Sequence, residues 1–328
     1  MIGFVVRRLR GRLPLAAAAL LTVLITTSVL TALVAFDRGA AEAGLRRALQ
    51  GTGAARAAVL VGGDRAVADR AGDDAAVAGF ARGLFGALPT TVESVARSRS
   101  YGLPGSADRP DLTVLAALDR SRTALLSGTW PAAPSPASAS VQAAVPQNAL
   151  AGLGLDAAAL PARLELTDRF TNRPLTVEVT GVYRAADPSD PYWRTDPAAG
   201  RGVQVLAYTT YGPLLVDDAV FTSGAVAQAG RSWLVRADFA GLTPGAAAAL
   251  RARVAPAGAA LKQDAALTAD TGLDALLGEL ASDAQVARST LLVGALQLAV
   301  LAGAALLLVV HLLADRQAAE NRLLAARG

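Results

Sequence analysis

Two long stretches without a charged residue lie near opposite ends of the chain, at residues 13–36 and 289–314, and a long segment of mixed polar and apolar residues separates them. An α-helix rises about 1.5 Å per residue, so each stretch is long enough to cross the roughly 30 Å hydrocarbon core of a bilayer. The pattern predicts two membrane-spanning helices, and with them contact with the lipid bilayer.

Arginines flank both apolar stretches on the side that faces a chain terminus. They are Arg7, Arg8, Arg10 and Arg12 before the first stretch, and Arg316, Arg322 and Arg327 after the second. Positive charges beside a membrane helix mark its cytoplasmic end. We therefore expect a cell-membrane protein with a cytoplasmic basic N-terminus (residues 1–12), a cytoplasmic tail (residues 315–328) and a large extracytoplasmic segment between the helices.

The distribution of charge agrees with this division. Of the 31 Lys and Arg residues, 24 remain when these seven arginines are removed, and of the 27 Asp and Glu residues, 25 remain when Asp315 and Glu320 are removed. The middle segment is thus close to neutral, and the basic pI of about 9.9 comes from the two ends. An excess of basic over acidic residues that is confined to the membrane flanks does not indicate a nucleic-acid partner.

A cleaved signal peptide is the alternative interpretation of the first stretch, because its basic flank would look the same. Signal peptides carry an apolar core of about 7 to 15 residues. Residues 13–36 form a much longer core, and the small-residue cleavage site near Ala41 is weak. We therefore expect the helix to be retained.

Hydrophobic periodicity in the middle segment changes between the spacing of helices and that of strands. Around the turn-rich residues 168–174, for example, apolar and polar positions alternate, which is typical of a hairpin with one buried face. The chain has no Cys, so the fold must rest on its core rather than on disulfides.

The predicted fold class is α+β. Helices are predicted at residues 73–88, 146–153 and 243–254, and strands at residues 57–61, 92–101, 112–118, 141–145, 163–167, 175–179, 203–208 and 232–237.

Leucines at helical spacing extend both membrane helices beyond the bilayer. Residues 37–52 and 268–288 are predicted to form two such stalk helices, which we expect to pair with each other. The α+β domain of residues 53–267 lies between them, and its length allows two subdomains.

Three local motifs resemble one family. Residues 126–131 read Leu-Ser-Gly-Thr-Trp-Pro, residues 179–183 read Val-Thr-Gly-Val-Tyr and precede the turn-rich residues 187–193, and residues 320–328 read Glu-Asn-Arg-Leu-Leu-Ala-Ala-Arg-Gly. Together with the order of helix, external domain and helix, they resemble the N-terminal half of FtsX/MacB-like permeases of ABC transporters. The resemblance spans the whole chain, and the last motif is the most specific.

The resemblance implies a permease-type membrane subunit that couples ATP hydrolysis by a partner ATPase to movement of the extracytoplasmic domain. It also implies a cytosolic ABC ATPase as partner, together with a second permease half or a second copy of the chain. The resembled permeases continue beyond the position of Gly328 into at least two further membrane helices. The chain is therefore expected to be either a truncated permease or one that works beside a subunit supplying the missing half.

Residue types that carry catalysis are scarce. His311 is the only histidine and falls within the second apolar stretch, where an interfacial polar role is more common than proton transfer. Without Cys or a second His, no metal site and no Ser-His-Asp arrangement is expected. The chain also lacks the G-x-x-x-x-G-K-[ST] pattern of a phosphate-binding loop. The acid pairs Asp73-Asp74 and Asp217-Asp218 are interpreted as solvated surface, so we expect neither enzymatic activity nor a cofactor.

Two groups of residues are candidate partner contacts. In the tail, Glu320, Leu323, Leu324 and Arg327 are expected to dock the ATPase, although a solvated basic tail would look similar. In the external domain, Trp130, Tyr192 and Trp193 stand beside Pro-rich segments and are expected to contact an external partner, with packing of the loops as the alternative.

A function from a different class also fits the sequence. The chain could serve as a membrane-anchored scaffold or sensor whose external domain binds an envelope protein or a ligand, without any ATPase. Neither the substrate nor the oligomeric state follows from the sequence.

Overall fold

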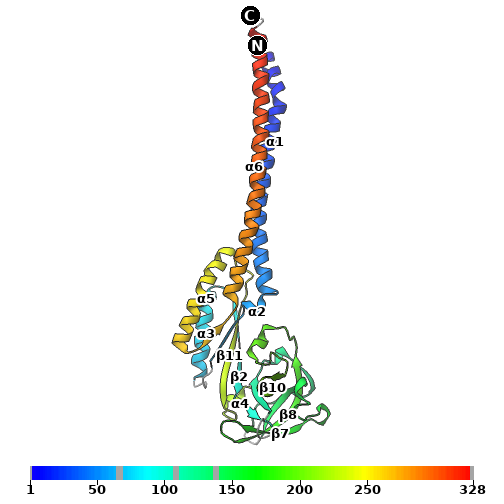
Figure 1. The fold of residues 1–328 in the computed structure, drawn as a ribbon, viewed down its shortest axis with the longest axis vertical. Helices are drawn as coiled ribbons and strands as arrows, with labels where there is room; N and C mark the ends of the chain where they lie inside the picture. The colour runs from blue at the N-terminus through cyan, green and yellow to red at the C-terminus, as the bar shows by residue number, and fades with distance from the viewer. Residues whose placement is uncertain (1, 64–68, 106–110, 136–139, 326–328) are drawn as a thin grey trace. The chain divides into compact units, whose positions relative to one another are not determined.

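The computed structural model describes residues 2–63, 69–105, 111–135 and 140–325. The fold is a mixed α+β arrangement, as predicted, and the chain divides into two compact units. Unit 1 consists of Met1–Leu45 and Gly278–Gly328, and unit 2 consists of Arg46–Leu277. Two long helices, α1 (Ile2–Gln50) and α6 (Leu273–Ala325), each contribute residues to both units (Figure 1).

Helix α6 provides the apolar segment of unit 1 that can cross a membrane. In the described part of the chain, it is the one helix long and apolar enough to do so, over Leu273–Leu312, and its 18-residue apolar window has a mean hydropathy of 2.5 and no buried residue. The described apolar stretch of α1, Leu20–Leu33, is shorter than the about 20 residues that a span needs. The span predicted at residues 13–36, the first of the two along the chain, is therefore not shown by the structure and stays a prediction.

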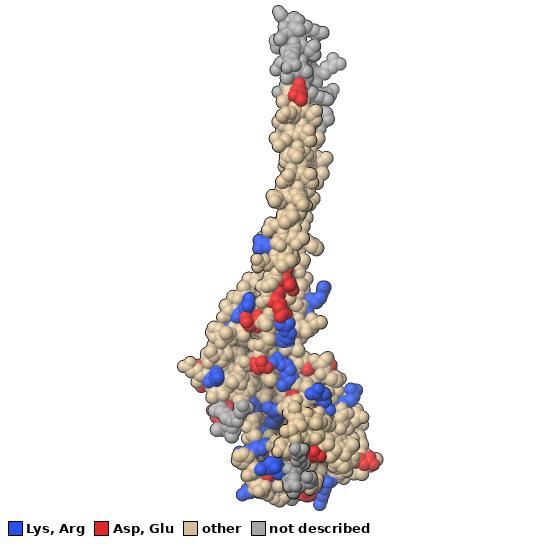
Figure 2. Space-filling model, in the orientation of Figure 1, with Lys and Arg blue, Asp and Glu red and all other residues tan. Residues whose placement is uncertain are grey.

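The apolar surface of unit 1 is unevenly covered. Most large apolar side chains are exposed, such as Leu296 at 66% and Leu307 at 68%. The partly covered positions recur every three or four residues, which is the spacing of one helix face. They are Leu291, Ala295, Leu298, Ala302, Leu306 and Val309 on α6, and Thr22, Thr26, Leu30 and Leu33 on α1. The partly covered positions thus form one stripe on each helix, and the rest of this apolar surface is uncovered and almost free of charged side chains (Figure 2).

Unit 2 begins with an open antiparallel sheet in the order β12-β1-β11-β2. Helices α3 and α5 pack against each other beside this sheet (Figure 1). As predicted, Val77, Phe80 and Leu84 form the buried side of α3. The bounds are β1 Val59–Gly63, β2 Thr90–Ser98, β11 Gln228–Ala237, β12 Thr268–Asp270, α2 Ala54–Ala57, α3 Arg70–Phe85 and α5 Pro244–Ala265.

The remaining strands form a small barrel. Described strands β4, β3, β7, β8, β6 and β10 pair in that order, and the parallel pairing of β10 with β4 closes the ring. Strand β4 also pairs with β2, so the barrel and the open sheet share one hydrogen-bonded network. The bounds are β3 Tyr101–Gly102, β4 Leu112–Ala117, β5 Thr123–Gly128, β6 Val141–Pro146, β7 Ala162–Asp168, β8 Pro174–Ala185, β9 Val203–Val205, β10 Thr209–Leu215, α4 Ala219–Thr222, and the 3-10 helices η1 Arg120–Arg122, η2 Gln147–Ala149, η3 Ala157–Ala159 and η4 Pro191–Thr195.

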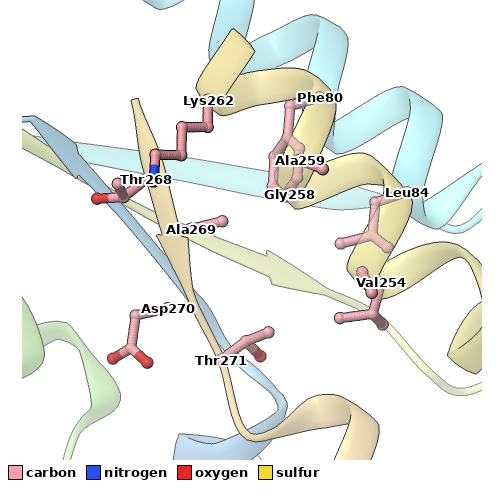
Figure 3. A pocket seen from close by; sticks show the side chains of 11 residues that line it. Phe80, Leu84, Val254, Gly258, Ala259, Lys262, Thr268, Ala269, Asp270 and Thr271 are labelled. Atoms are coloured by element: carbon pink, nitrogen blue, oxygen red, sulfur yellow. The ribbon is translucent and has the colours of Figure 1, made fainter. Parts of the chain in front are cut away.

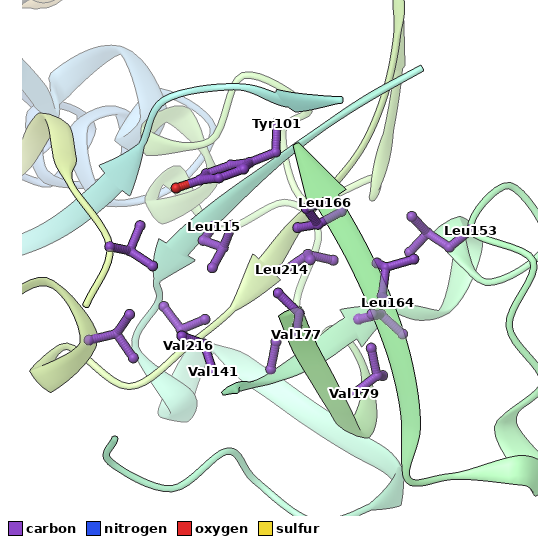
Figure 4. Packing of buried hydrophobic residues seen from close by; sticks show 14 of the residues in the cluster. Tyr101, Leu115, Val141, Leu153, Leu164, Leu166, Val177, Val179, Leu214 and Val216 are labelled. Atoms are coloured by element: carbon purple, nitrogen blue, oxygen red, sulfur yellow. The ribbon is translucent and has the colours of Figure 1, made fainter. Parts of the chain in front are cut away.

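Apolar side chains fill the barrel. Leu164 and Leu166 of β7, Val177 and Val179 of β8, and Leu214 of β10 are buried together (Figure 4). Successive residues of a strand point to opposite faces, so the predicted alternation around residues 168–174 supplies one inward-facing row on each strand. The hairpin prediction for this segment is confirmed.

Several sequence predictions of local structure are wrong. The stalk helix predicted at residues 268–288 begins only at Leu273, because Thr268–Asp270 pair with β1 as strand β12. The strand predicted at residues 203–208 ends at Val205, and the next strand, β10, was not predicted because Gly212 and Pro213 favour a turn. The helix predicted at residues 146–153 is only the short 3-10 turn η2. The helix predicted to end at residue 254 continues through Pro256 to Ala265, although proline usually ends a helix because it lacks an N–H and clashes with the preceding turn.

Candidate functional site

Two short segments of unit 2 adjoin the long helices, and we call them together the junction. The first, residues 46–58, holds the last turn of α1 and helix α2. The second, residues 268–277, holds strand β12 and the first turn of α6. Both segments lie within unit 2.

A single guanidinium group joins both segments of the junction. Arg194 of η4 donates through Nη1 to the carbonyl oxygens of Ala55 and Ala58, both at 2.8 Å. Through Nη2 it donates to the carbonyl oxygen of Asp270 at 3.2 Å and to Oδ2 of the same residue at 3.1 Å. The carbonyls at the end of α2 and strand β12 are therefore held by one side chain.

Thr271 provides a second connection between the two segments. Its Oγ1 lies 3.3 Å from the carbonyl oxygen of Arg56 and 3.2 Å from that of Ala58, to which it donates. The same oxygen accepts the backbone N–H of Leu273 at 3.1 Å. It thereby satisfies one of the N–H groups that the start of α6 leaves without a helical partner.

Close backbone approach completes the junction. A Cβ on Gly53 would lie 2.4 Å from the carbonyl oxygen of Ala48 and 2.9 Å from Cδ2 of Leu276, so this position has room only for glycine. The leucines predicted at stalk spacing are buried here, with exposed fractions of 0% at Leu273, 6% at Leu276 and 3% at Leu277. The first turn of α6 is thus part of the core of unit 2.

An ion-pair network fixes the segment that carries Arg194. Arg122 Nη1 lies 2.8 Å from Asp190 Oδ2, and Arg236 Nη2 lies 2.7 Å from Glu93 Oε2. The Arg122 Nε also donates to Glu93 Oε1 at 3.0 Å, and this hydrogen bond raises the pKa of Arg122 despite the opposing effect of burial. Asp190 in turn accepts the N–H of Tyr192 at 2.8 Å and begins η4. The network therefore ties η4 to β2 and β11.

Two of the three candidate aromatic contacts are buried beside this network. Tyr192 is 0% and Trp193 3% exposed, and their ring centroids lie 5.3 Å apart in an edge-on arrangement. The Tyr192 hydroxyl accepts the N–H of Asp119 at 2.8 Å, and Trp193 Nε1 donates to the carbonyl of Asp187 at 2.9 Å. Burial raises the pKa of Tyr192. The two rings pack inside the domain, as the loop-packing alternative for them predicts. Trp130 is half-buried beside Arg120, and a contact there stays a prediction.

No protein-family model matches the chain, and no curated protein matches it. Among solved structures, the chain is similar to one described as "a domain of a putative Permease protein" from Porphyromonas gingivalis. The sequence identity is 11% and the TM-score is 0.29, and the match covers 66% of this chain and 89% of that chain.

The predicted ATPase-docking residues lie outside the part of the chain that can be described in detail. Glu320, Leu323 and Leu324 belong to helix α6, but their side chains are not among those that the structure describes. Arg327 lies outside the described residues altogether. Docking through this tail stays a prediction.

The interpretation of the acid pairs as solvated surface is wrong for Asp73, which faces inward from the first turn of α3 and is only 5% exposed. The other three acids, Asp74, Asp217 and Asp218, pair with arginines. Asp74 Oδ1 accepts Trp233 Nε1 at 2.6 Å and lies 3.3 Å from Arg231 Nη2, while Asp218 lies 2.7 Å from Arg70. Desolvation lowers the pKa of Arg231. Within the described ranges, no three His, Asp or Glu side chains converge as metal ligands would. These contacts indicate structural roles for the acids.

Proposed function

We propose that the chain is the permease-type membrane subunit of an ABC-type complex. A separate cytosolic ATPase would hydrolyse ATP, and the resulting displacement of α1 and α6 would move the extracytoplasmic domain. The chain itself would perform no catalysis. Support comes from the motif resemblance to FtsX/MacB-like permeases, from the apolar span in α6, and from the construction of the junction.

The Arg194 contacts are the observation that carries the proposal. A displaced helix moves a domain only if the adjoining segments are held to that domain by contacts that persist. Arg194 binds the end of α2 and strand β12 together, and Thr271 binds the same two segments independently. From β12 the backbone hydrogen bonds continue through β1, β11 and β2 to the barrel strand β4. A displacement at the junction would therefore be distributed over one continuous sheet.

Co-purification and ATP hydrolysis test this proposal. The full chain would be expressed with a candidate ATP-binding-cassette protein and reconstituted in nanodiscs. We expect the two to co-purify and the chain to stimulate the ATPase. Arg194→Gln should leave co-purification intact but change the stimulation, because the ATPase would still bind while its coupling to the domain is weakened. Arg163→Gln, at an exposed position of β7, is the matched control. If no such ATPase associates with the unaltered chain, the scaffold or sensor function is favoured instead.

A further inference from the structure

A cavity of about 390 Å³ lies in unit 2 between helices α3 and α5 and strand β12 (Figure 3). Its walls include Phe80 and Leu84 of α3, Val254 and Lys262 of α5, and Ala269 of β12. This volume falls within the range of roughly 300–1,000 Å³ that small-molecule sites occupy. It opens at the surface, because Ala255, Ala259, Lys262, Thr268 and Asp270 of its lining are exposed, and its apolar floor is formed by the buried Phe80 and Leu84.

Small residues and a proline create the hollow. Ala255, Gly258 and Ala259 of α5 line it, and a Cβ built on Gly258 would meet only the Cβ of Ala269, at 4.0 Å. Larger side chains at these positions would fill the space, as they do elsewhere in the core. Pro256 lies inside α5 beside the lining residues, where its missing N–H removes a backbone hydrogen bond. Both features keep the wall of the cavity from closing.

One cation, which is exposed to solvent, stands at the edge of this pocket. Lys262 is the only lysine in the chain, and Figure 3 shows its side chain reaching from α5 toward Thr268 on β12. The other charged residue of the lining, Asp270, is paired with Arg194 at 3.1 Å, and its carboxylate lies on the side of β12 away from Phe80. The α5 side of the cavity therefore offers apolar walls and one ammonium group.

We propose that this cavity binds a small amphipathic anion. The apolar body of the ligand packs against Phe80, Leu84 and Val254, and its carboxylate pairs with the Nζ of Lys262. The bound ligand contacts β12, the strand that leads into α6 through Thr271. The inference goes beyond the proposed function, because it requires neither an ATPase nor transport.

The single lysine makes a direct test possible. The full chain in phosphatidylcholine nanodiscs is treated with a water-soluble N-hydroxysuccinimide ester, and acylation of Lys262 is followed by peptide mass spectrometry with and without octanoate. Only the unbound fraction reacts, so octanoate at about ten times its Kd should slow the acylation roughly tenfold. Octanol, which lacks the charge, and inorganic phosphate, which lacks the apolar body, should protect far less.

Two variants keep the test specific. Gly258→Leu places a side chain in the cavity and should abolish protection while Lys262 remains reactive. Arg253→Lys puts a second lysine on α5 outside the lining, and that lysine should be acylated equally with and without octanoate. The proposal is overturned if octanoate leaves the acylation of Lys262 unchanged, if it slows both lysines equally, or if protection survives Gly258→Leu. Protection by octanol or by phosphate equal to that by octanoate overturns the amphipathic-anion assignment.

Discussion

Arg194 contacts Asp270 twice, through the backbone carbonyl at 3.2 Å and through the carboxylate Oδ2 at 3.1 Å. The two residues are far apart in sequence, and the contact joins the η4 segment to the strand that precedes α6. The exposed carboxylate contributes little, since surface ion pairs are worth about 0–1 kcal/mol. Arg194 also binds the backbone carbonyls of Ala55 and Ala58, and these hydrogen bonds give the residue its structural importance.

Replacing Arg194 by Met should destabilise the extracytoplasmic domain. The carbonyl of Ala58 would keep only the hydroxyl of Thr271 as donor and the exposed carbonyl of Ala55 would turn to water, so we expect the loss of a net hydrogen-bond contribution of about 0.5–1.5 kcal/mol. Urea unfolding of the full chain, followed by tryptophan fluorescence, measures the effect. A loss of stability no larger than that of the surface variant Arg163→Met would contradict the role given to Arg194.

Two glycine-to-alanine substitutions should have opposite effects on stability. Gly53→Ala would force a Cβ to within 2.4 Å of the Ala48 carbonyl oxygen, and such overpacking costs roughly 1–3 kcal/mol. Gly258→Ala has ordinary contact at 4.0 Å and lies inside α5, so it should stabilise by about 0.5–1 kcal/mol. If the unfolding midpoints of both variants shift in the same direction, the packing described for one of the two glycines is contradicted.

Asp168 should make the domain sensitive to acid. Desolvation would raise the pKa of Asp168, but the N–H groups of Phe170 and Thr171 and the charge of Arg99 outweigh it and lower the pKa below 3.8. A lowered pKa means that the stabilising contribution is fully present above the unfolded value and is lost as the pH falls through the folded one. Asp168→Asn should therefore be less stable than the unaltered protein at pH 7, and the difference should shrink below about pH 4. Equal differences at pH 7 and pH 3 would argue against this role.

The extent of the independently folding domain can be tested with two fragments. Residues 53–267 carry the predicted domain. Compared with residues 46–277, they omit four buried leucines: Leu49, Leu273, Leu276 and Leu277. Each contributes roughly 1.5–3 kcal/mol when fully buried. A fragment of residues 46–277 should thus show a cooperative melt at a markedly higher temperature than one of residues 53–267. Identical melting temperatures would mean that the junction is not part of the domain core.

Sequence patterns predicted the parts of this fold that depend on local periodicity. The buried side of α3, the hairpin around residues 168–174 and the long apolar helix all follow from the spacing of their residues. Strand β10 was missed because Gly212 and Pro213 are local turn signals that long-range strand pairing overrides. The sequence left open whether Tyr192 and Trp193 pack within the domain, because the neighbouring Asp187, Pro188 and Asp190 are typical of an exposed loop.

The candidate site could not be predicted in the same way. Arg194 lies in a short 3-10 helix far from both junction segments in sequence, and no local feature distinguishes it from the other arginines. Its importance comes from tertiary contacts with Ala55, Ala58 and Asp270. The glycine at position 53 carried a signal, because it was predicted to lie where the first stalk ends, but its contact with Leu276 depends on the fold.

The central claim is that ATP hydrolysis by a partner acts on the domain through the junction, and hydrogen exchange measures this directly. The full chain with its ATPase in nanodiscs would be compared by mass spectrometry without nucleotide and with ATP plus vanadate. We predict that amide exchange changes at residues 54–58 and 268–272 while strands β7 and β8 of the barrel core exchange equally in both states, and that Arg194→Gln reduces the change. Exchange at the junction that is the same in both states, with the ATPase bound and active, would contradict the account.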